Sequence, residues 1–185
     1  MMTGALARQF LGILLAFAWL AAGCTKTPPP AKLPIAGTPA MAPTPQEATL
    51  SRVLQDFYGA PYKSGGTDPS GVDCSGLIQA VFQRAGVKLP RTVVQQYNTG
   101  QPVNLGDLRF GDVVFFNRFC QTKKYDIFVA GILPPAYVQE VCHNGIYIGE
   151  GRFVHASPRG VFVSRLDAEV WRASFMGARR YLNPH

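Results

Sequence analysis

Cys74 stands where a cysteine can act as a nucleophile. It follows Asp73, a residue type that caps helix N-termini, and an apolar repeat with the spacing of one helix face comes next: Leu77, Ile78, Val81 and Phe82. This pattern predicts a helix that begins at Cys74 and ends near Gly86. In its first turn, unpaired backbone N–H groups and the helix dipole favour a thiolate, which is the nucleophilic form of cysteine. The alternative is a small thiol buried beneath the helix.

Of the three histidines in the chain, two lie in predicted strands and could supply a base. His143 opens the segment 143–149, and His155 lies in the segment 152–156. A hairpin through 149–151 would bring both imidazoles onto one sheet face. If that face packs against the N-terminus of the Cys74 helix, His143 can take the thiol proton and later protonate a leaving amine. His155 would then hold His143 in the useful tautomer; either histidine alone would more often be structural.

The elements that must position these residues change type along the chain. A first helix is predicted from a capping box with proline at its first position, and it ends near Gly59; the box is formed by Thr44, Pro45 and Glu47. The Cys74 helix follows, and a short helix after 89–92 ends near Gly100. Strands are expected at 112–116, 145–149, 153–156, 161–164 and 178–182. Helices followed by strands predict an α+β domain, with N-terminal helices packed on a central antiparallel sheet of about five strands.

The N-terminal part of the chain is predicted to be a signal and a tether. In residues 1–23, Arg8 precedes an apolar run that is too short to span a bilayer comfortably. The small residues before Cys24 resemble a bacterial lipoprotein signal, in which cleavage leaves Cys24 as the lipid-bearing first residue. An ordinary signal peptidase site or an uncleaved anchor are the alternatives. Residues 24–44 are rich in Pro, Ala and Thr, which predicts an extended tether.

The lipoprotein resemblance implies a location. The domain would face the periplasm and be held to a membrane through Cys24. Thr25 follows Cys24, and by resemblance to enterobacterial lipoproteins this favours the outer membrane over the inner one.

Length, charge and composition limit the remaining choices. The chain of 185 residues leaves one domain of ordinary size at 45–185. Its formal charge of +7 favours acidic partners such as an anionic cell envelope. Nucleic acid is not indicated, because no basic run with interleaved aromatic residues or known binding motif is present. The four cysteines are widely scattered rather than clustered with histidines at ligand spacings, so we expect no metal and no cofactor.

Several separated motifs point to one family. They are Tyr62 with the glycines at 65–66, and the segments 73–77, 89–92, 111–116, 143–149 and 153–156. Through them, residues 54–181 resemble the NlpC-type bacterial cell-wall cysteine peptidases, which have a compact papain-like fold. The resemblance implies that Cys74 is the nucleophile, His143 the base and His155 the third polar member. It also implies that Tyr62 and the backbone N–H of Cys74 form the oxyanion site. Asp73 and Ser75 match positions that contact the peptide stem in some relatives.

The reaction implied by this resemblance is hydrolysis of an amide bond in peptidoglycan stems or crosslinks through a thioester acyl-enzyme. The family favours the D-Glu–diaminopimelate bond or the diaminopimelate–D-Ala bond, and the sequence does not choose between them. Two alternatives stay open. One is a non-hydrolytic wall-binding or scaffold lipoprotein that retains the fold, and the other is a papain-like acyltransferase or amidase.

The segment 117–142 departs from the family pattern, because relatives connect the preceding strand to the base histidine in fewer residues. Since this insertion leads into His143, we expect a substrate-selecting flap or a docking surface for a protein partner; a tolerated surface insertion is the alternative. With Cys24 and Cys74 assigned by resemblance, Cys120 and Cys142 remain as a candidate disulfide. Two unpaired thiols are the alternative.

Two polar residues near the motifs receive no chemical role. Asn144 occupies a position that is often apolar in relatives, and a local bend would explain it. Gln96 lies on the predicted short helix, where its side chain could reach the edge of a cleft, although we expect it to be solvated, as polar helix positions usually are.

Overall fold

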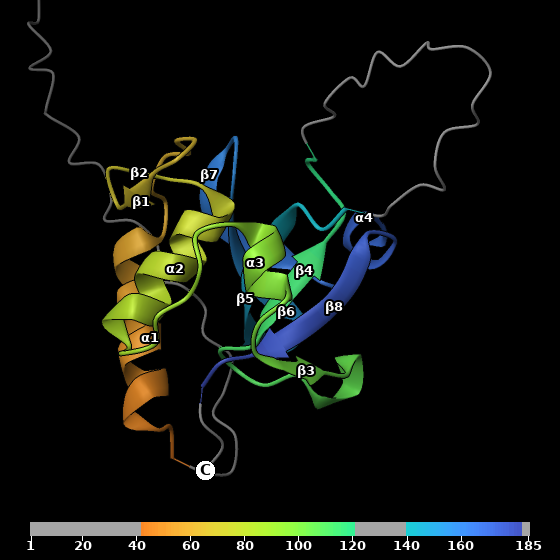
Figure 1. Cartoon of the computed structure of the whole chain (residues 1–185), viewed down its shortest axis with the longest axis horizontal. Coiled ribbons are helices and arrows are strands. Elements are labelled where there is room, and N and C mark those ends of the chain that lie inside the picture. Colours follow the sequence, from red (N-terminus) through yellow and green to blue (C-terminus); the bar gives the residue numbers. More distant parts are fainter. Residues whose placement is uncertain (1–41, 121–139, 183–185) are drawn as a thin grey trace, which may run out of the picture.

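The computed structural model describes residues 42–120 and 140–182, which form helices packed against an antiparallel sheet (Figure 1). The helices are α1 (Pro45–Phe57), α2 (Cys74–Arg84), α3 (Val93–Tyr97) and α4 (Glu169–Arg172), with a 3₁₀ turn at Leu105–Asp107. Helices α1 and α2 lie side by side at one flank of the sheet, and α4 lies at the other (Figure 1). The predicted α+β class is confirmed.

The main sheet has six strands in the order β3-β8-β4-β5-β6-β7. All neighbouring strands run antiparallel. Their bounds are β3 (Gln101–Val103), β4 (Val113–Phe116), β5 (His143–Gly149), β6 (Arg152–Ser157), β7 (Gly160–Arg165) and β8 (Phe175–Arg180). The prediction of about five strands omitted β3, a short strand with exposed residues that carries no apolar alternation. The final strand also ends at Arg180 rather than at residue 182.

A second, two-stranded sheet lies just before α2. It pairs β1 (Thr67–Asp68) with β2 (Gly71–Val72), and Tyr62 forms an isolated parallel bridge with Val72. The backbone N–H of Lys63 donates to the Val72 carbonyl at 3.1 Å. The sequence predicted only a turn-rich loop here, because strands of this length carry no periodic pattern.

The start of α1 has the predicted capping box. The N–H of Glu47 donates to the Thr44 hydroxyl at 3.1 Å, and the Thr44 N–H donates to the Glu47 carboxylate at 2.8 Å. These bonds satisfy N–H groups that would otherwise have no partner in the first helical turn. One face of the helix is buried, as its spacing predicts, and consists of Leu50, Val53, Leu54 and Phe57.

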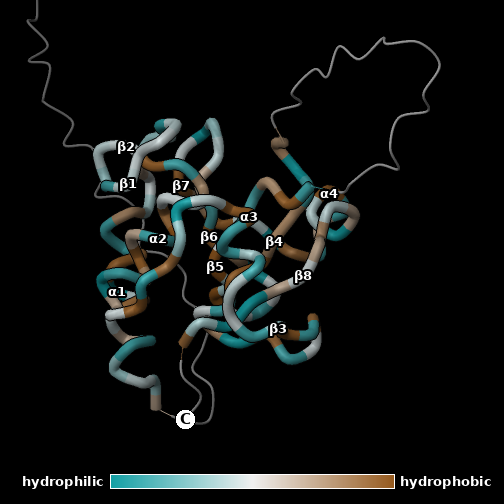
Figure 2. Tube along the Cα trace, in the orientation of Figure 1, coloured by the Kyte–Doolittle hydropathy of each residue, from teal (hydrophilic) through white to brown (hydrophobic). Residues whose placement is uncertain are grey.

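Side-chain alternation along β4 divides the interior into two hydrophobic clusters. Val113 and Phe115 join the larger cluster with α1 and α2, whereas Val114 and Phe116 join a smaller one on the other face of the sheet. Trp171 of α4 belongs to the smaller cluster. Hydrophobic segments accordingly lie in the middle of the molecule, on the central strands and on the two long helices (Figure 2). His143 pairs in register with Phe116 and stacks on Trp171, so its side chain lies on the face of the smaller cluster. Helix α2 packs on the other face, so the expectation that the imidazole face packs against this helix is not met.

Some sequence-based predictions fall outside the described residues. These include the signal segment at 1–23, Cys24, most of the tether and residues 121–139 of the insertion. Among the described helices, none combines the length and apolar character needed to cross a membrane.

Candidate active site

Cys74 is the first residue of α2, and the loop before the helix is pressed against it. The Asp73 carboxylate accepts a hydrogen bond from the Gly76 N–H at 2.7 Å and so caps the helix. A Cβ atom at Gly76 would lie 2.1 Å from the Gly66 carbonyl oxygen, so only glycine permits this contact. Cys74 itself is half-buried. A local cap and a close loop contact thus hold the thiol at the tip of the helix.

The environment of the thiol does not favour a thiolate. Burial, followed by the nearby Asp73 carboxylate, raises the pKa of Cys74 to about 11. Hydrogen bonds from the backbone N–H groups of Ser75, Cys74 and Asn144 lower the pKa but do not outweigh those two effects. The sequence-based prediction that the helix N-terminus yields a thiolate is therefore wrong for the resting protein, because it ignored desolvation.

His143 and His155 lie on adjacent strands and contact each other. His143 Nε2 and His155 Nδ1 are 3.0 Å apart, and the two rings meet edge to face. The second nitrogen of His155, Nε2, lies 2.9 Å from the Ser164 hydroxyl on β7. The hairpin therefore aligns a chain of polar groups across three strands, and it leaves Nδ1 as the His143 nitrogen that is not engaged by His155.

Aromatic side chains of the smaller cluster surround the two imidazoles. Trp171 stacks on His143 with 5.6 Å between ring centroids and meets the His155 ring at 4.8 Å. Burial is the main cause that lowers the pKa of each histidine to about 3, and in His143 the charges of His155 and Arg118 add to it. Both rings are therefore neutral near pH 7, as a proton acceptor must be.

Gly145 permits the close approach of β5 and β6 beside the histidines. A Cβ atom there would lie 2.7 Å from the Val154 carbonyl oxygen and 3.1 Å from His155 Cβ. Any larger residue would force the two strands apart. The glycine in the 143–149 motif thus has a steric role that the sequence motif alone does not explain.

The start of β5 lies against the tip of α2, which brings the histidine strand to the thiol. The backbone N–H of Asn144 lies near enough to the thiol to lower the pKa of Cys74. Within the described residues, the structure has no hydrogen bond from that sulfur to the His143 ring.

Tyr62 lies close enough to the helix tip to interact electrostatically with it. Burial raises the pKa of Tyr62, the charges of Cys74 and Asp73 raise it further, and Arg91 lowers it. The phenol is therefore protonated near neutral pH and can donate a hydrogen bond. The parallel bridge between Tyr62 and Val72 ties this residue to the strand that leads into Cys74.

Asp73 and Ser75 are already engaged by Arg91. The guanidinium donates to the two Asp73 oxygens at 3.0 and 2.5 Å, and to the Ser75 hydroxyl at 2.7 Å. Gly65 donates its N–H to Asp73 Oδ2 at 2.8 Å. Burial alone would raise the pKa of Asp73, but the bonds from Arg91, Gly76 and Gly65 outweigh it and hold the pKa below its ordinary value. The two residues proposed to contact substrate therefore also fix the helix tip.

Gln96 and Asn144 form a buried amide pair behind the site. Gln96 donates from Nε2 to the Ser75 carbonyl at 3.1 Å and to the Pro90 carbonyl at 2.8 Å. Its Oε1 accepts a bond from Asn144 Nδ2 at 2.6 Å. Gln96 is fully buried, so the prediction that it is solvated is wrong. Because Ser75 belongs to α2 and Asn144 to β5, this one amide joins the two elements that carry the thiol and the base.

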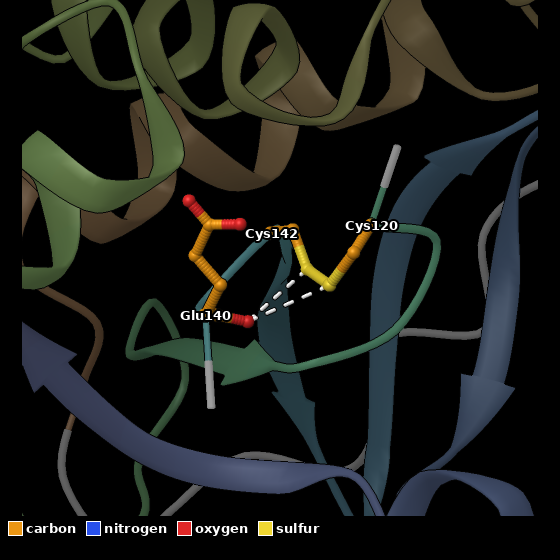
Figure 3. Close-up of a disulfide and its surroundings, with 3 residues drawn as sticks. All are labelled: Cys120, Glu140 and Cys142. Carbon is orange, nitrogen blue, oxygen red and sulfur yellow. Dashed lines mark hydrogen bonds between the residues drawn. A yellow bond between two sulfur atoms is a disulfide. The ribbon is translucent and has the colours of Figure 1, made fainter. Parts of the chain in front are cut away.

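Cys120 and Cys142 are joined by a disulfide, with their Cα atoms 5.1 Å apart. Figure 3 shows the Glu140 carbonyl oxygen facing the bridge, 3.1 Å from Cys142 Sγ and 3.5 Å from Cys120 Sγ. The bridge joins the end of the segment after β4 to the residue before His143. Cys74 is the free cysteine of the described residues.

Five residues with a clear place at the site received no role from the sequence: Arg91, Gln96, Asn144, Ser164 and Trp171. Arg91 lies inside the 89–92 motif, so its place in that motif could have indicated a role for this residue. Trp171 lies on α4, an element too short to predict from apolar spacing. The part of the chain that the structure describes contains no group of three or more His, Cys, Asp or Glu residues able to hold a metal ion.

Comparison with known proteins gives consistent matches. Residues 59–180 match the NlpC/P60 family. The chain is 38% identical over 154 residues to gamma-DL-glutamyl hydrolase of Bacillus subtilis, covering 80% of this chain and 32% of that protein. It is 37% identical over 135 residues to a probable endopeptidase of Haemophilus influenzae, covering 72% of this chain and 73% of that protein.

A third relative is the murein DD-endopeptidase MepS/murein LD-carboxypeptidase of Escherichia coli, 35% identical over 138 residues, with 72% of this chain and 63% of that protein covered. The chain thus spans less than two thirds of the length of this protein and of the hydrolase.

Solved structures agree with the fold. An NlpC/P60 family protein from Bacillus cereus superimposes with a TM-score of 0.61 at 31% identity, covering 76% of this chain and 42% of that one. A lipoprotein-like member of the family from Staphylococcus aureus gives 0.62 at 29% identity, covering 80% and 45%. The matched residues contain Tyr62, Cys74, His143 and His155, so the fold and the site lie within one matched domain. The chain belongs to the NlpC/P60 family.

Proposed function

We propose that this chain is a cysteine endopeptidase that hydrolyses an amide bond in peptidoglycan stems or crosslinks. The observation that carries the proposal is the hydrogen bond between His143, at the start of β5, and His155 on β6. The backbone N–H of the next residue, Asn144, lies near enough to Cys74 to lower the pKa of its thiol. The relatives named as endopeptidases and as a gamma-DL-glutamyl hydrolase support this chemistry.

The two reacting groups start uncharged, with a Cys74 pKa of about 11 and a His143 pKa of about 3. Proton transfer from Cys74 Sγ to His143 must therefore accompany the attack on the carbonyl carbon, rather than precede it. The new S–C bond forms, the C–N bond breaks and His143 returns the proton to the leaving amine. Water then hydrolyses the thioester with the same histidine acting as base.

The hydrogen-bond chain specifies the tautomers that this mechanism needs. If His143 accepts the thiol proton at Nδ1, its Nε2 carries a hydrogen and donates to His155 Nδ1. His155 then carries its hydrogen on Nε2 and donates to the Ser164 hydroxyl. The positive charge that develops on His143 is stabilised through this chain.

Substrate contacts are assigned on the same basis. The Tyr62 hydroxyl and the Cys74 backbone N–H would stabilise the oxyanion, because Tyr62 lies near the thiol and stays protonated. Asp73 and Ser75 would contact the stem peptide while sharing their hydrogen bonds with Arg91. Either the D-Glu–diaminopimelate bond or the diaminopimelate–D-Ala bond fits the scheme.

The location of the protein is proposed from its N-terminal residues. Cleavage before Cys24 and its acylation would tether the domain to the outer membrane, facing the periplasm. The mass of the mature N-terminal peptide tests this, since diacyl and acyl groups add a characteristic mass to Cys24. An unmodified Cys24, or a retained segment 1–23, would contradict it.

Incubation of the full chain with purified peptidoglycan tests the function. We expect new amine and carboxyl termini in the products, identified by mass spectrometry, and no such products with Cys74→Ala. Binding without cleavage by both proteins would instead support a scaffold, and products carrying a transferred acyl group would support an acyltransferase. The site of cleavage in the products identifies the scissile bond.

A further inference from the structure

Arg118 lies beside the proposed base and shares its aromatic neighbours. Strand β4 ends at Phe116, which pairs in register with His143. Beyond it, the Arg118 guanidinium carbon lies 4.9 Å from the centroid of the Phe119 ring and 5.5 Å from that of Trp171. The same two rings contact His143, at 5.2 Å and 5.6 Å between centroids. The guanidinium and the imidazole therefore belong to one aromatic cluster.

The hydrogen-bond donors of Arg118 have no protein partner among the described residues. Its Nε is buried without a hydrogen bond, and neither a hydrogen bond nor an ion pair joins its guanidinium to residues 42–120 or 140–182. Arg152 also has a buried Nε without a hydrogen bond, but its Nη2 pairs with the Glu150 carboxylate. Arg91, Arg165 and Arg180 likewise each pair with a carboxylate, whereas Arg118 does not. Buried N–H groups in native proteins nearly always have a partner, so the buried Nε of Arg118 indicates a missing acceptor.

The geometry also defines what kind of acceptor fits. Cation–π contacts use the faces of a guanidinium and leave its in-plane N–H groups available. Those donors match a planar anion such as a carboxylate, which they can bind through two parallel hydrogen bonds. Peptidoglycan stems carry carboxylates on D-Glu and diaminopimelate, close to the bonds that the proposed reaction cleaves.

Building on the proposed function, we propose that Arg118 binds a carboxylate of the stem peptide beside His143. The protein would then select stems with free carboxyl groups over stems in which those groups are amides. The Cys120–Cys142 disulfide supports this role, because it ties the segment that carries Arg118 to the residue before His143. The cation is thereby held at a defined position next to the base.

Bound substrate would also change the charge that His143 experiences. The positive charge of Arg118 opposes protonation of this histidine, in addition to burial and His155. A carboxylate paired with Arg118 offsets that charge, so His143 accepts the thiol proton more readily during attack. A free carboxyl group is therefore expected to raise kcat as well as to lower KM.

Calorimetric titration of the full chain carrying Cys74→Ala tests the proposal without turnover. The probes are a stem peptide that contains the D-Glu–diaminopimelate bond with free carboxyl groups, and the same peptide with these groups as primary amides. We expect the free peptide to bind about tenfold more tightly or better, the usual size of a hydrogen bond to a charged group. Arg118→Gln should abolish the preference, and Arg118→Lys should retain part of it.

Arg84→Gln is the matched control, because Arg84 also lies over an aromatic ring, that of Phe57, at 5.2 Å, but far from the histidines on the exposed side of α2. It should leave the preference unchanged. Equal affinity for the two peptides, or an undiminished preference in Arg118→Gln, would overturn the role of Arg118. If Arg118→Gln does not fold, the test uses Arg118→Lys and the ratio of its affinities for the free peptide and the amide peptide. This ratio should fall only if Arg118 contacts the carboxylate directly.

Cleavage of the two peptides by the chain with Cys74 intact separates this inference from the proposed function. Cleavage of both at equal rates would refute the Arg118 contact and leave the peptidase in place. Selective binding of the free peptide without cleavage would refute the peptidase and leave the contact in place.

Discussion

Replacing Gln96 with leucine tests whether the buried amide pair holds α2 against β5. The change keeps a side chain of similar size but removes one donor group and one acceptor. It leaves the Ser75 and Pro90 carbonyls and Asn144 Nδ2 without the partners they have at 3.1, 2.8 and 2.6 Å. Asn144 Oδ1 already has no hydrogen-bond partner, so in the variant neither the oxygen nor the nitrogen of the Asn144 amide has the partner it needs.

The expected effect follows from the cost of burying unsatisfied polar groups. Each orphaned group costs about 1–3 kcal/mol, and partial relaxation reduces the total, so Gln96→Leu should lower the free energy of unfolding by about 3–6 kcal/mol. Such a loss is a large fraction of the stability of a typical domain, which is about 5–15 kcal/mol. The surviving folded protein should also lose kcat, because the thiol and the histidine strand are no longer joined through this amide.

Urea unfolding followed by far-UV circular dichroism measures the effect. Gln95→Leu is the matched control, since Gln95 lies on the same helix, is exposed and only completes the capping box with Thr92. That variant should lose about 1 kcal/mol or less. Adding Asn144→Val to Gln96→Leu should recover part of the stability, because both partners are then apolar. Equal losses for Gln95→Leu and Gln96→Leu would refute the reasoning.

Four further outcomes are expected. The rate at which iodoacetamide alkylates Cys74, followed by peptide mass spectrometry, should rise about tenfold per pH unit above pH 7. It should level off only near the Cys74 pKa of about 11. A plateau below pH 9 would contradict this raised pKa. His143 has a pKa of about 3 and must be neutral to act as base, so kcat/KM should stay level from pH 7 to about pH 4 and fall to half near pH 3. An acid limb centred near pH 6.5 would count against this assignment. Gly145→Ala should lower the urea midpoint, with a loss of about 1–3 kcal/mol in the free energy of unfolding, and it should also lower kcat. Gly106→Ala should change neither, because no atom lies within 4 Å of the Cβ it would add. Ser164→Ala should reduce kcat about tenfold, whereas Ser164→Thr, which keeps the hydroxyl, should retain most of it. Equal kcat in the unchanged protein and in both variants would show that the hydroxyl takes no part in the mechanism.

Sequence reasoning succeeded where the determining interactions are local. The cap of α2 involves Asp73 and the N–H three residues later, and the apolar face of α1 follows from a repeat within one helix. The hairpin that brings His143 and His155 together needs only a short turn between two strands. Interactions of this kind are encoded within about ten residues, so periodicity and capping rules detect them.

The same reasoning failed where distant segments meet. Gln96 was expected in solvent, yet its partners come from α2, the 89–92 segment and β5. The prediction of a thiolate considered only the helix of Cys74 and not the segments that bury it. Short elements such as β3 and α4 also escaped detection, because their few residues carry no measurable period.

Interactions between neighbours in the chain were thus enough to predict the order of the longer helices and strands, the position of Cys74 at a helix N-terminus and the pairing of two histidines on one hairpin. The raised pKa of that thiol, the burial of the amide pair and the placement of Arg118 and Trp171 around His143 follow instead from the packing of segments that are distant in the chain. The reason is physical: capping and periodicity act between neighbours in the chain, whereas desolvation and electrostatic interaction depend on every group that packing brings near.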